Sequence, residues 1–481
     1  MPKIVLLWTD TVVLGLVVLL LFYGWRVLKL PIQRARWLRV FSDAPALCSA
    51  PLLLLFMLPT LLDSLHFRVA LPAAPGTVAG SAQAYDTRTQ SLLDLALRPL
   101  IERRESSYSA PLAYRGFVKQ TSLELGKTER EFPRLSFAGA HLKDPATEWL
   151  PDLLTRGAVG LVYGVVLALL GALVVGNFTA RGRGLSLGSA LGELARDRTE
   201  LPLRALLITW TLVALLAGVI FALAGGYHVL GTDRTGNDVL YQALKSIRTA
   251  FVIGALATVA TLPFAIALGV MAGYFKGWVD ELIQYIYTVL SSVPFILLIA
   301  ACVLMMQVYI DKHAELFETG AERADVRIFL LCVIVGVTGW AGLCRLLRGE
   351  TLKLRELDYV QAATAFGVSH WRIMARHILP NVMHLVLITT VLSFSDLILF
   401  EAVLSYIGIG VDPSMNSFGG MINQARGEIA RDPMVWWSFA AAFFFMVALV
   451  LAANLFSDGV RDAFDPRARA FRPRLRKGAA A

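Results

Sequence analysis

The chain has few charged residues and few cysteines, and both features restrict the class of protein to which it can belong. Asp, Glu, Lys and Arg make up 17% of its 481 residues, whereas an average soluble domain has about 25%. Its four cysteines lie singly within apolar runs and form no Cys-x-x-Cys pair; they are Cys48, Cys302, Cys332 and Cys344. Isolated thiols of this kind are typical of small buried hydrophobic side chains. The pattern argues against paired-cysteine chemistry and against an ordinary soluble domain.

Motifs that would make the chain an enzyme are also missing. The sequence contains no HExxH, no GxSxG and no set of protein-kinase motifs. The stretch GKT at 126–128 looks like the end of a phosphate-binding loop, but Thr121 stands where that loop requires a glycine. His370, His377 and His384 recur every seven residues, about 10 Å apart along a helix, which is too far for a shared metal ion. We therefore predict no catalytic residue, no metal site and no ATP hydrolysis by this chain.

Long apolar runs are what the sequence has in abundance. Hydrophobic residues make up 56% of the chain, and its mean hydropathy is +0.62. About 20 apolar residues in a helix span the ~30 Å hydrocarbon core of a bilayer. Runs of this length predict nine spans, at about 4–25, 45–65, 157–178, 203–224, 249–272, 280–308, 327–347, 383–404 and 434–456. The predicted fold class is an all-α polytopic membrane protein.

Arginine and lysine gather in four regions, which follow the first, third, seventh and ninth predicted spans. All four regions lie on one side of the membrane if nine spans are right, and an excess of these residues marks the cytoplasmic side. This orientation places Met1 outside; Met1 lies inside only if the first run does not cross the membrane. The basic residues at these membrane borders and in the tail explain the net charge of +9, so the charge does not indicate binding to a nucleic acid.

One partly basic loop between two apolar runs is more ordered than a simple connection. Leu357 to Phe366 has helical spacing, and Gly367 stands where a helix ends in a left-handed residue. Ser369 can cap a second helix, and Pro380 limits it. Small side chains at the bend let another backbone approach closely; they are Ala362, Ala363 and Ala365. A small-residue helix on the cytoplasmic side is typical of a docking element.

The same loop, LDYVQAATAFGVSHWRIMARHILPN at 357–381, resembles the EAA loop of ABC importer permeases, in the form carried by dipeptide, oligopeptide and nickel importers. Gln361 stands where the family name has glutamate. Four further blocks resemble this family in the family's own order, and they match its C-type permease subunit. They are HVLGTDRTGNDVL at 228–240, GYFKGWVDELIQYIYTVLSSVPFILL at 273–298, EAVLSYIGIGVDPS at 401–414 and NLFSDGVRDAFDPR at 454–467.

The resemblance implies a six-span permease core of the type I ABC importer fold at 200–469, with a cytoplasmic coupling loop at about 348–382. Residues 1–199 are predicted to form an N-terminal extension, with about three more spans and an external segment at about 67–156. Residues 470–481 are predicted to form a basic cytoplasmic tail. Two interpretations of the external segment stay open: an added contact for a binding protein or partner permease, or a lineage-specific decoration.

The resemblance also implies a function, namely ATP-driven import of peptides or similar small solutes by a non-catalytic subunit of the bacterial inner membrane. It implies a second permease subunit, in a heterodimer by family practice, and two ABC ATPase subunits that use ATP and Mg²⁺. An extracytoplasmic substrate-binding protein would deliver the substrate, and this chain itself would bind no cofactor. Nickel, an opine or a peptide-like antibiotic stays open as the substrate. The alternative is a secondary transporter or channel driven by an ion gradient without an ATPase, although we see no inverted repeat or paired intramembrane charges that would favour it.

The coupling residues follow from the resemblance together with side-chain size and charge. Ala362, Ala363 and Gly367 would allow close packing against an ATPase subunit. Arg372 and Arg376 would pair with acidic residues of that subunit. The predicted coupling set is Gln361, Ala362, Ala363, Gly367, Arg372, Arg376 and Pro380.

The block at 228–240 is predicted by the resemblance to line the external mouth, beneath the binding protein. Gly231-Thr232-Asp233 is typical of a turn, and Asn237 stands where the family has arginine. A structural cap and a direct substrate contact both stay open as its role. The predicted set is His228, Gly231, Thr232, Asp233, Gly236 and Asp238.

Asp238 can also cap a helix that is apolar along one side. Polar residues fall on the other side of this helix, at Gln242, Lys245, Ser246 and Arg248. A helix of this kind is expected to lie in the membrane interface before the chain turns into the fifth span.

Two acidic residues lie within the eighth predicted span, where a charge is costly unless it faces protein or water. Asp396 would either contact a cationic substrate group in the pathway or pair within the helix bundle. Glu401 matches a family block and is predicted to serve structural pairing or gating at the subunit interface.

Overall fold

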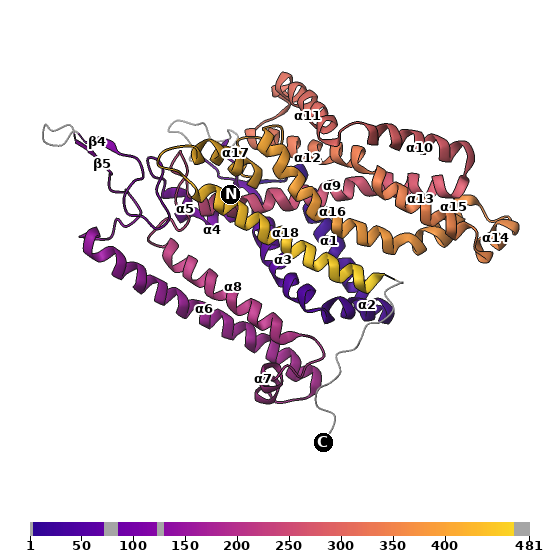
Figure 1. Cartoon of the computed structure of the whole chain (residues 1–481), viewed down its shortest axis with the longest axis horizontal. Coiled ribbons are helices and arrows are strands. Elements are labelled where there is room, and N and C mark those ends of the chain that lie inside the picture. The colour runs from indigo at the N-terminus through magenta and orange to yellow at the C-terminus, as the bar shows by residue number, and fades with distance from the viewer. Residues whose placement is uncertain (1–2, 72–84, 123–128, 466–481) are drawn as a thin grey trace, which may run out of the picture. The chain divides into compact units, whose positions relative to one another are not determined.

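The computed structural model describes residues 3–71, 85–122 and 129–465, most of which lie in helices (Figure 1). The chain divides into two compact units, and each unit is built from three stretches of sequence. Unit 1 comprises Met1–Lys29, Thr60–Leu92 and Ile247–Asn423, and unit 2 comprises Leu30–Pro59, Leu93–Ser246 and Gln424–Ala481.

Unit 1 contains most of the helices predicted for the permease core. Helices α3 (Ala44–Asp63), α9 (Val239–Phe275) and α17 (Phe418–Ile429) each cross the boundary between the units. The other helices of unit 1 are α1 (Trp8–Lys29), α10 (Gly277–Ser292), α11 (Phe295–Lys312), a short 3₁₀ turn η2 (Ala314–Leu316), α12 (Gly320–Gly339), α13 (Ala341–Arg355), α14 (Asp358–Ala365), α15 (His370–Ile373), the π-helical turn η3 (Met374–Ile378) and α16 (Leu379–Ile407).

Two glycines allow α9 and α13 to pack closely in unit 1. Gly269 and Gly273 lie four residues apart on α9 and therefore on one face of it. A Cβ atom on Gly269 would lie 2.9 Å from the carbonyl oxygen of Cys344, and one on Gly273 would lie 2.6 Å from Cβ of Thr351. Small residues at this spacing let helix backbones approach each other within a membrane. Substituting a larger side chain would push α13, which leads into the predicted coupling loop, away from α9.

A small antiparallel sheet holds the start of α1 beside the chain that follows α3. Strands β1 (Lys3–Val5), β2 (His66–Arg68) and β3 (Gln90–Ser91) pair in the order β1-β2-β3. The register places Val5 opposite His66 and His66 opposite Ser91. The sheet thereby brings His66 near the first turn of α1.

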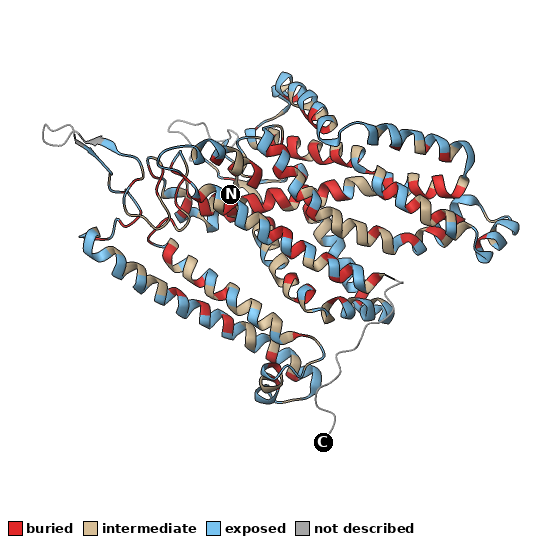
Figure 2. Cartoon of the chain, in the orientation of Figure 1, coloured by how far each residue is buried: buried red, intermediate tan, exposed pale blue. Residues whose placement is uncertain are grey.

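Unit 2 is built around a long helical hairpin of α6 and α8, which run side by side in Figure 1. A Cβ atom on Gly160 would lie 2.7 Å from Cα of Val219, and one on Gly164 would lie 2.6 Å from Cα of Leu215. The outer faces of both helices are largely exposed (Figure 2), as expected of surfaces that contact lipid. The elements of this unit are α2 (Pro31–Ser42), α4 (Leu92–Ala96), α5 (Arg98–Glu102), β4 (Gln120–Ser122), β5 (Glu129–Glu131), α6 (Pro145–Arg183), α7 (Leu187–Ala195), α8 (Leu203–Ala224) and α18 (Trp437–Phe464).

The number of spans agrees with the sequence prediction. Among the described residues, eight helices are long and apolar enough to cross a membrane, or nine if the bent pair α12 and α13 forms one span. The helix that contains the third predicted span is longer than expected, because α6 begins at Pro145.

Two predictions about the fifth and sixth spans were wrong. The run at 280–308 is not one span but two helices, which break at Val293 and Pro294. Proline lacks the amide hydrogen of a helical residue and disfavours a helical residue before it. Only α11 of the two is long and apolar enough to cross. The predicted interfacial helix after Asp238 does not turn either, since α9 runs without a break to Phe275.

Candidate functional site

The predicted coupling loop is an ordered structure of short helices in unit 1. Helix α14 ends at Ala365, and Gly367, which follows the cap residue Phe366, has a φ of 72° in the left-handed region, as predicted. The Gly367 amide donates to the carbonyl oxygen of Thr364 at 3.0 Å, and the Val368 amide donates to that of Ala363 at 3.1 Å. These two bonds form a Schellman motif, which satisfies the last carbonyl groups of the helix. The bend is therefore fixed by backbone geometry.

The second half of the loop differs from the prediction. Ser369 occupies the N-cap position of α15, but its hydroxyl makes no capping hydrogen bond. Pro380 does not end the helix; it lies in the first turn of α16, directly after the π-helical turn. Proline cannot donate the usual hydrogen bond to the residue four positions earlier, and a wider π turn accommodates that loss. The chain continues from His370 to Ile407 as one span-length run.

The loop has a buried inner face and an exposed outer face. Val360, Ile373 and Ile378 are at most 1% exposed and belong to one apolar cluster with α9, α10 and α13. On the outer face, Phe366 is 86% exposed and Trp371 is 67% exposed. The sequence analysis missed these two aromatic residues, although their positions beside Gly367 and the helix start could have singled them out. Large apolar side chains exposed on an otherwise polar surface make this face a candidate contact site.

The predicted coupling residues lie on or near this outer face. Gln361, Ala362, Arg372, Arg376 and Pro380 are exposed, and Ala363 is half-buried against the apolar cluster. Within the described part of the chain, neither arginine has a carboxylate oxygen within 4.0 Å. A Cβ atom added to Gly367 would meet no atom within 4 Å. The space over the bend is therefore open.

Polar contacts fix the loop to the neighbouring helices of unit 1. The Tyr274 hydroxyl lies 2.8 Å from His370 Nδ1. Arg348 of α13 makes two hydrogen bonds to the Asp280 carboxylate of α10, at 2.5 and 2.7 Å. Lys276 pairs with Glu356 at 2.8 Å. A displacement of the loop would therefore be transmitted to α9, α10 and α13.

The external block at 228–240 is a compact turn in unit 2. Gly231 and Gly236 both have positive φ, 73° and 79°. The Asp233 carboxylate accepts hydrogen bonds from the amides of Thr235, at 2.8 Å, and Asn237, at 2.9 Å. Asp238 caps α9 as predicted, because its Oδ1 accepts from the Leu240 amide at 2.8 Å. The structure thus brings the predicted residues of this block together.

His228 lies between two carboxylates at the centre of this block. Its Nδ1 is 2.7 Å from Oδ2 of Asp238, and its Nε2 is 3.7 Å from Oε1 of Glu105. Burial disfavours the charged imidazolium, but the hydrogen bonds and charges of Asp238 and Glu105 outweigh this and raise the pKa of His228 to about 9. His228 is therefore positively charged at neutral pH, and its attraction to the carboxylates of Asp238 and Glu105 stabilises the turn.

Residues of the N-terminal extension cover the external block. Glu105 accepts hydrogen bonds from the amides of Ser136, Phe137 and Ala138 at 2.8 to 3.2 Å. Burial would raise the pKa of Glu105, but His228 and these three amides lower it. Thr232 donates to the carbonyl oxygen of Ser107 at 2.9 Å and is fully buried.

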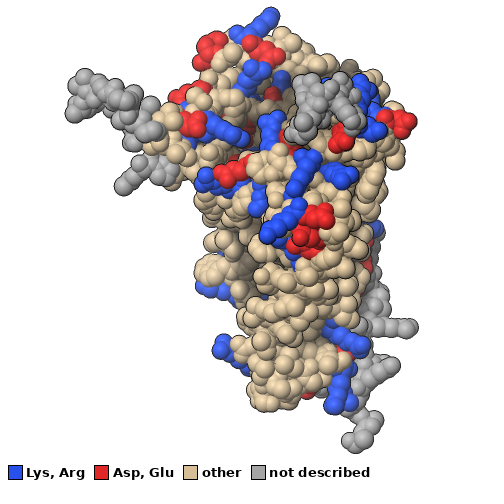
Figure 3. Space-filling model, turned by 90° about the vertical axis from the view of Figure 1, so that its left-hand side faces the viewer, with Lys and Arg blue, Asp and Glu red and all other residues tan. Residues whose placement is uncertain are grey.

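The cover fills the space next to both glycines of this turn. A Cβ atom on Gly236 would overlap the carbonyl oxygen of Glu105, and one on Gly231 would lie 2.5 Å from that of Ser109. In Figure 3, basic and acidic side chains stand close together in the upper part of the view, and a broad area without charge lies below them. The extension therefore covers Gly231 and Gly236, whereas Asp233 stays partly exposed.

A buried ion cluster in unit 1 was missed by the sequence analysis. Arg248 is 2% exposed and donates to Oδ1 of Asp10 at 2.6 Å. Asp325 and Asp63 lie 3.7 and 4.0 Å from its guanidinium group, and His66 Nδ1 lies 2.7 Å from Oδ2 of Asp10. The prediction had placed Arg248 on the polar face of an interfacial helix. Its partners lie far away in the sequence, in α1, α3 and α12, and local periodicity does not reveal them.

The two acidic residues within α16 have different surroundings. Asp396 is exposed and, among the described residues, has no cationic partner within 4.0 Å. Glu401 is 1% exposed, and its Oε1 accepts from the Ser405 hydroxyl at 2.6 Å. Glu401 thus lies within the bundle of unit 1, and Asp396 faces outward from it.

The described residues contain no group of three His, Cys, Asp or Glu side chains placed to hold a metal ion. The histidines that recur every seven residues have separate neighbours. His370 is near Tyr274, as described above, and His384 Nδ1 lies 2.8 Å from the carbonyl oxygen of Asn381.

Comparisons with known proteins place this architecture in a family. The sequence pattern of the family described as "Binding-protein-dependent transport system inner membrane component" matches residues 265–470. The oligopeptide transport system permease protein OppC of Haemophilus influenzae is 31% identical over 244 residues, which is 51% of this chain and 72% of that protein. OppC of Mycobacterium tuberculosis is 32% identical over 252 residues, 52% of this chain and 80% of that protein. The glutathione transport system permease protein GsiD of Pectobacterium atrosepticum is 33% identical over 240 residues, with 50% and 73% covered. The chain therefore belongs to the binding-protein-dependent inner membrane components, as a multi-pass permease subunit of an ABC importer.

Proposed function

We propose that this chain imports peptides, as one of two permease subunits that form the pathway of an ABC importer. Two ATPase subunits would bind on the cytoplasmic side, and an extracytoplasmic binding protein would deliver the substrate. The observation that carries this proposal is the exposed outer face of the coupling loop. The names of the relatives, which refer to oligopeptides and glutathione, support peptides as the substrate class.

The chain's own part in coupling is to hold a rigid bend above an apolar cluster. The Schellman motif fixes the bend, and Val360 and Ile373 anchor its inner face. Phe366 and Trp371 would enter a groove of the ATPase, and Arg372 and Arg376 would pair with acidic residues there. ATP binding, which draws two ATPase subunits together, would move the bend and, through it, α13 and α16. Uptake would follow from the change between outward-open and inward-open arrangements.

The domain boundary near residue 199 and the separate roles of the two parts belong to the same proposal. The matched family region begins at residue 265 and lies almost wholly within the proposed core at 200–469. The N-terminal extension would stabilise the external block from outside, since Glu105 and Ser109 contact it directly. A partner permease, different from this chain, would complete the pathway.

Co-purification tests the proposal. The chain would be expressed with the products of its neighbouring genes, as wild type, as Gly367→Trp and as Gly184→Trp. Gly184 is a matched control, because it also ends a helix at positive φ (65°) and has no neighbouring atom within 4 Å of an added Cβ. We expect wild type and Gly184→Trp to retain stoichiometric ATPase subunits and Gly367→Trp to lose them.

Two results would overturn the proposal. A well-folded wild type without ATPase subunits would make a carrier driven by an ion gradient the leading alternative. Normal coupled ATP hydrolysis by Gly367→Trp would show that the bend is not the docking element.

Transport assays test the substrate class. Uptake of labelled tripeptides, glutathione and Ni²⁺ would be compared in proteoliposomes that contain the whole importer. We propose that Asp396 faces the pathway, so Asp396→Asn should slow the uptake of a lysine-containing tripeptide more than that of a neutral tripeptide. Equal slowing of both peptides would remove Asp396 from the pathway.

A further inference from the structure

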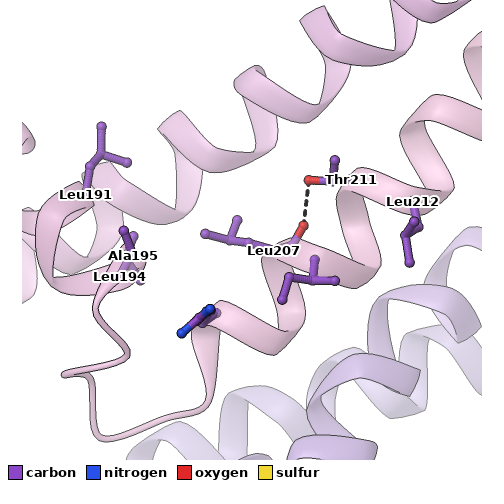
Figure 4. Close-up of a pocket in the computed structure, with 8 residues that line it drawn as sticks. Leu191, Leu194, Ala195, Leu207, Thr211 and Leu212 are labelled. Atoms are coloured by element: carbon purple, nitrogen blue, oxygen red, sulfur yellow. Dashed lines mark hydrogen bonds between the residues drawn. The ribbon is translucent and has the colours of Figure 1, made fainter.

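A groove in unit 2 lies outside all the sites described so far. It has a volume of about 350 Å³ and is formed by α7 and the first half of α8 (Figure 4). This volume is within the usual range of small-molecule sites, about 300–1,000 Å³. Its lining is apolar except for one arginine and one threonine: Leu191, Leu194, Ala195, Arg204, Leu207, Ile208, Thr211 and Leu212.

The groove exists because the chain folds back after α6. Gly184 ends α6 in the left-handed region, and Ser186 then caps α7 by accepting a hydrogen bond from the Ser189 amide. Helix α7 buries Ala190 and Leu194 on one face. Leu191 packs against α6, where a Cβ atom on Gly176 would lie 2.8 Å from Cδ2 of Leu191. A short amphipathic helix held in this way is typical of the membrane interface.

The charge around the groove is positive. The stretch from Arg181 to Arg204 contains five arginines and three acidic residues, which marks it as a cytoplasmic border. Arg204 lies in the first turn of α8, which has no side-chain cap. Within the described residues, no carboxylate oxygen lies within 4.0 Å of Arg204. The amides of Leu203 and Ala205 donate to backbone carbonyl oxygens, so Arg204 itself is the group that favours an anion at this end of the groove.

The other end of the groove is apolar and exposed. Leu212 is 64% exposed and Ile208 is 53% exposed. Thr211 adds one polar group to this end, its hydroxyl. This hydroxyl already donates a hydrogen bond to the carbonyl oxygen of Leu207 at 2.7 Å (Figure 4). A ligand of this groove therefore needs a long apolar part and an anionic head at the cytoplasmic border.

We propose that this groove binds an anionic phospholipid of the cytoplasmic leaflet, with an acyl chain between α7 and α8 and the phosphate on Arg204. Basic pockets between helices at this depth are a known kind of lipid site. A free phosphate would leave the apolar lining unused, and a protein helix would leave the cation without a partner. The lipid would stabilise the turn between α6 and α8.

Lipid titration tests the proposal, with native mass spectrometry of the full chain in detergent as the measurement. The titrants are phosphatidylglycerol and phosphatidylcholine with identical acyl chains, and the variants are Arg204→Gln, Ala195→Trp and Arg196→Gln. Arg196→Gln is the matched control, because Arg196 lies in the same stretch but does not line the groove. We expect wild type and the control to prefer phosphatidylglycerol by about fivefold. Arg204→Gln should lose this preference. Ala195→Trp, which fills the groove, should weaken the binding of both lipids.

Four outcomes would overturn the proposal. An unchanged preference in Arg204→Gln would remove the headgroup contact, and equal losses in Arg204→Gln and Arg196→Gln would indicate diffuse charge attraction. Unchanged lipid binding by Ala195→Trp would place the lipid elsewhere. Displacement of the lipid by millimolar inorganic phosphate would also contradict it, because the acyl chain would then contribute nothing.

Discussion

Two turns of this chain share one backbone conformation and have opposite surroundings. Gly236 of the external block has a φ of 79°, and Gly367 of the coupling loop has a φ of 72°. An added Cβ atom would overlap the carbonyl oxygen of Glu105 at Gly236, but it would meet nothing within 4 Å at Gly367. At Gly236 the space is filled by the chain's own extension, and at Gly367 it is open. The comparison teaches that a family-like motif can be either a structural joint or a docking site, and that its neighbours decide which.

The largest effect on stability is expected at the turn around Gly236, where the extension fills the space. Gly236→Ala combines the cost of a left-handed residue with a backbone overlap at Glu105, and we expect a loss of about 4–5 kcal/mol or a failure to fold. Gly367→Ala adds only the conformational cost, about 1 kcal/mol. Thermal unfolding of both variants in detergent measures the difference. Equal losses would mean that the surroundings of the two glycines do not matter, and the comparison would fail.

The second effect concerns the carboxylate that joins the extension to the external block. Glu105→Gln removes the charge that accepts three amide hydrogen bonds and faces His228. Breaking a buried charged pair leaves the other charge without compensation, and we expect a loss of about 3 kcal/mol. The matched control is Glu102→Gln, because Glu102 pairs with Arg98 on the exposed side of α5. Such a surface pair contributes at most about 1 kcal/mol, so a similar loss in the control would contradict the assignment.

The sequence could predict what is local in both turns. Helical spacing followed by glycine was enough to place the bend at Gly367, and the position of Asp238 was enough to predict the cap of α9. The burial of His228 was not predictable, because it depends on Glu105, which is 123 residues away in a part without family resemblance. Arg248 is a similar case. Its place on the polar side of a helix was predicted, but the aspartates that neutralise it come from distant helices. Periodicity reports the preference of one segment, whereas charge pairing depends on the tertiary fold.

A third effect is expected from pH. The pKa of His228 is raised from 6.5 to about 9 in the folded chain. The stabilisation by this charge is therefore fully present below pH 6.5 and is lost as the pH rises toward 9, an effect of about 3 kcal/mol. Unfolding curves of wild type between pH 6 and pH 10 should show this loss, and His228→Gln should lack it. A curve that is flat over this range would show that His228 is not held charged by Glu105 and Asp238.

The smallest effect on stability is expected at the open turn, where the effect on partner binding should be large. Phe366 is 86% exposed, so Phe366→Ala removes almost no buried area, and unfolding should change by no more than about 0.5 kcal/mol. If the outer face of the loop is a docking surface, the same change should weaken the retention of ATPase subunits by at least tenfold, since exposed aromatic side chains often dominate an interface. The matched control is Phe178→Ala, because Phe178 is 76% exposed on α6 and outside the coupling loop. An equal loss of ATPase subunits in both variants would indicate a general defect in assembly. No loss in Phe366→Ala would assign docking to Arg372 and Arg376 or to the bend at Gly367. The open turn can therefore be distinguished from the filled one by measuring folding and binding on the same proteins.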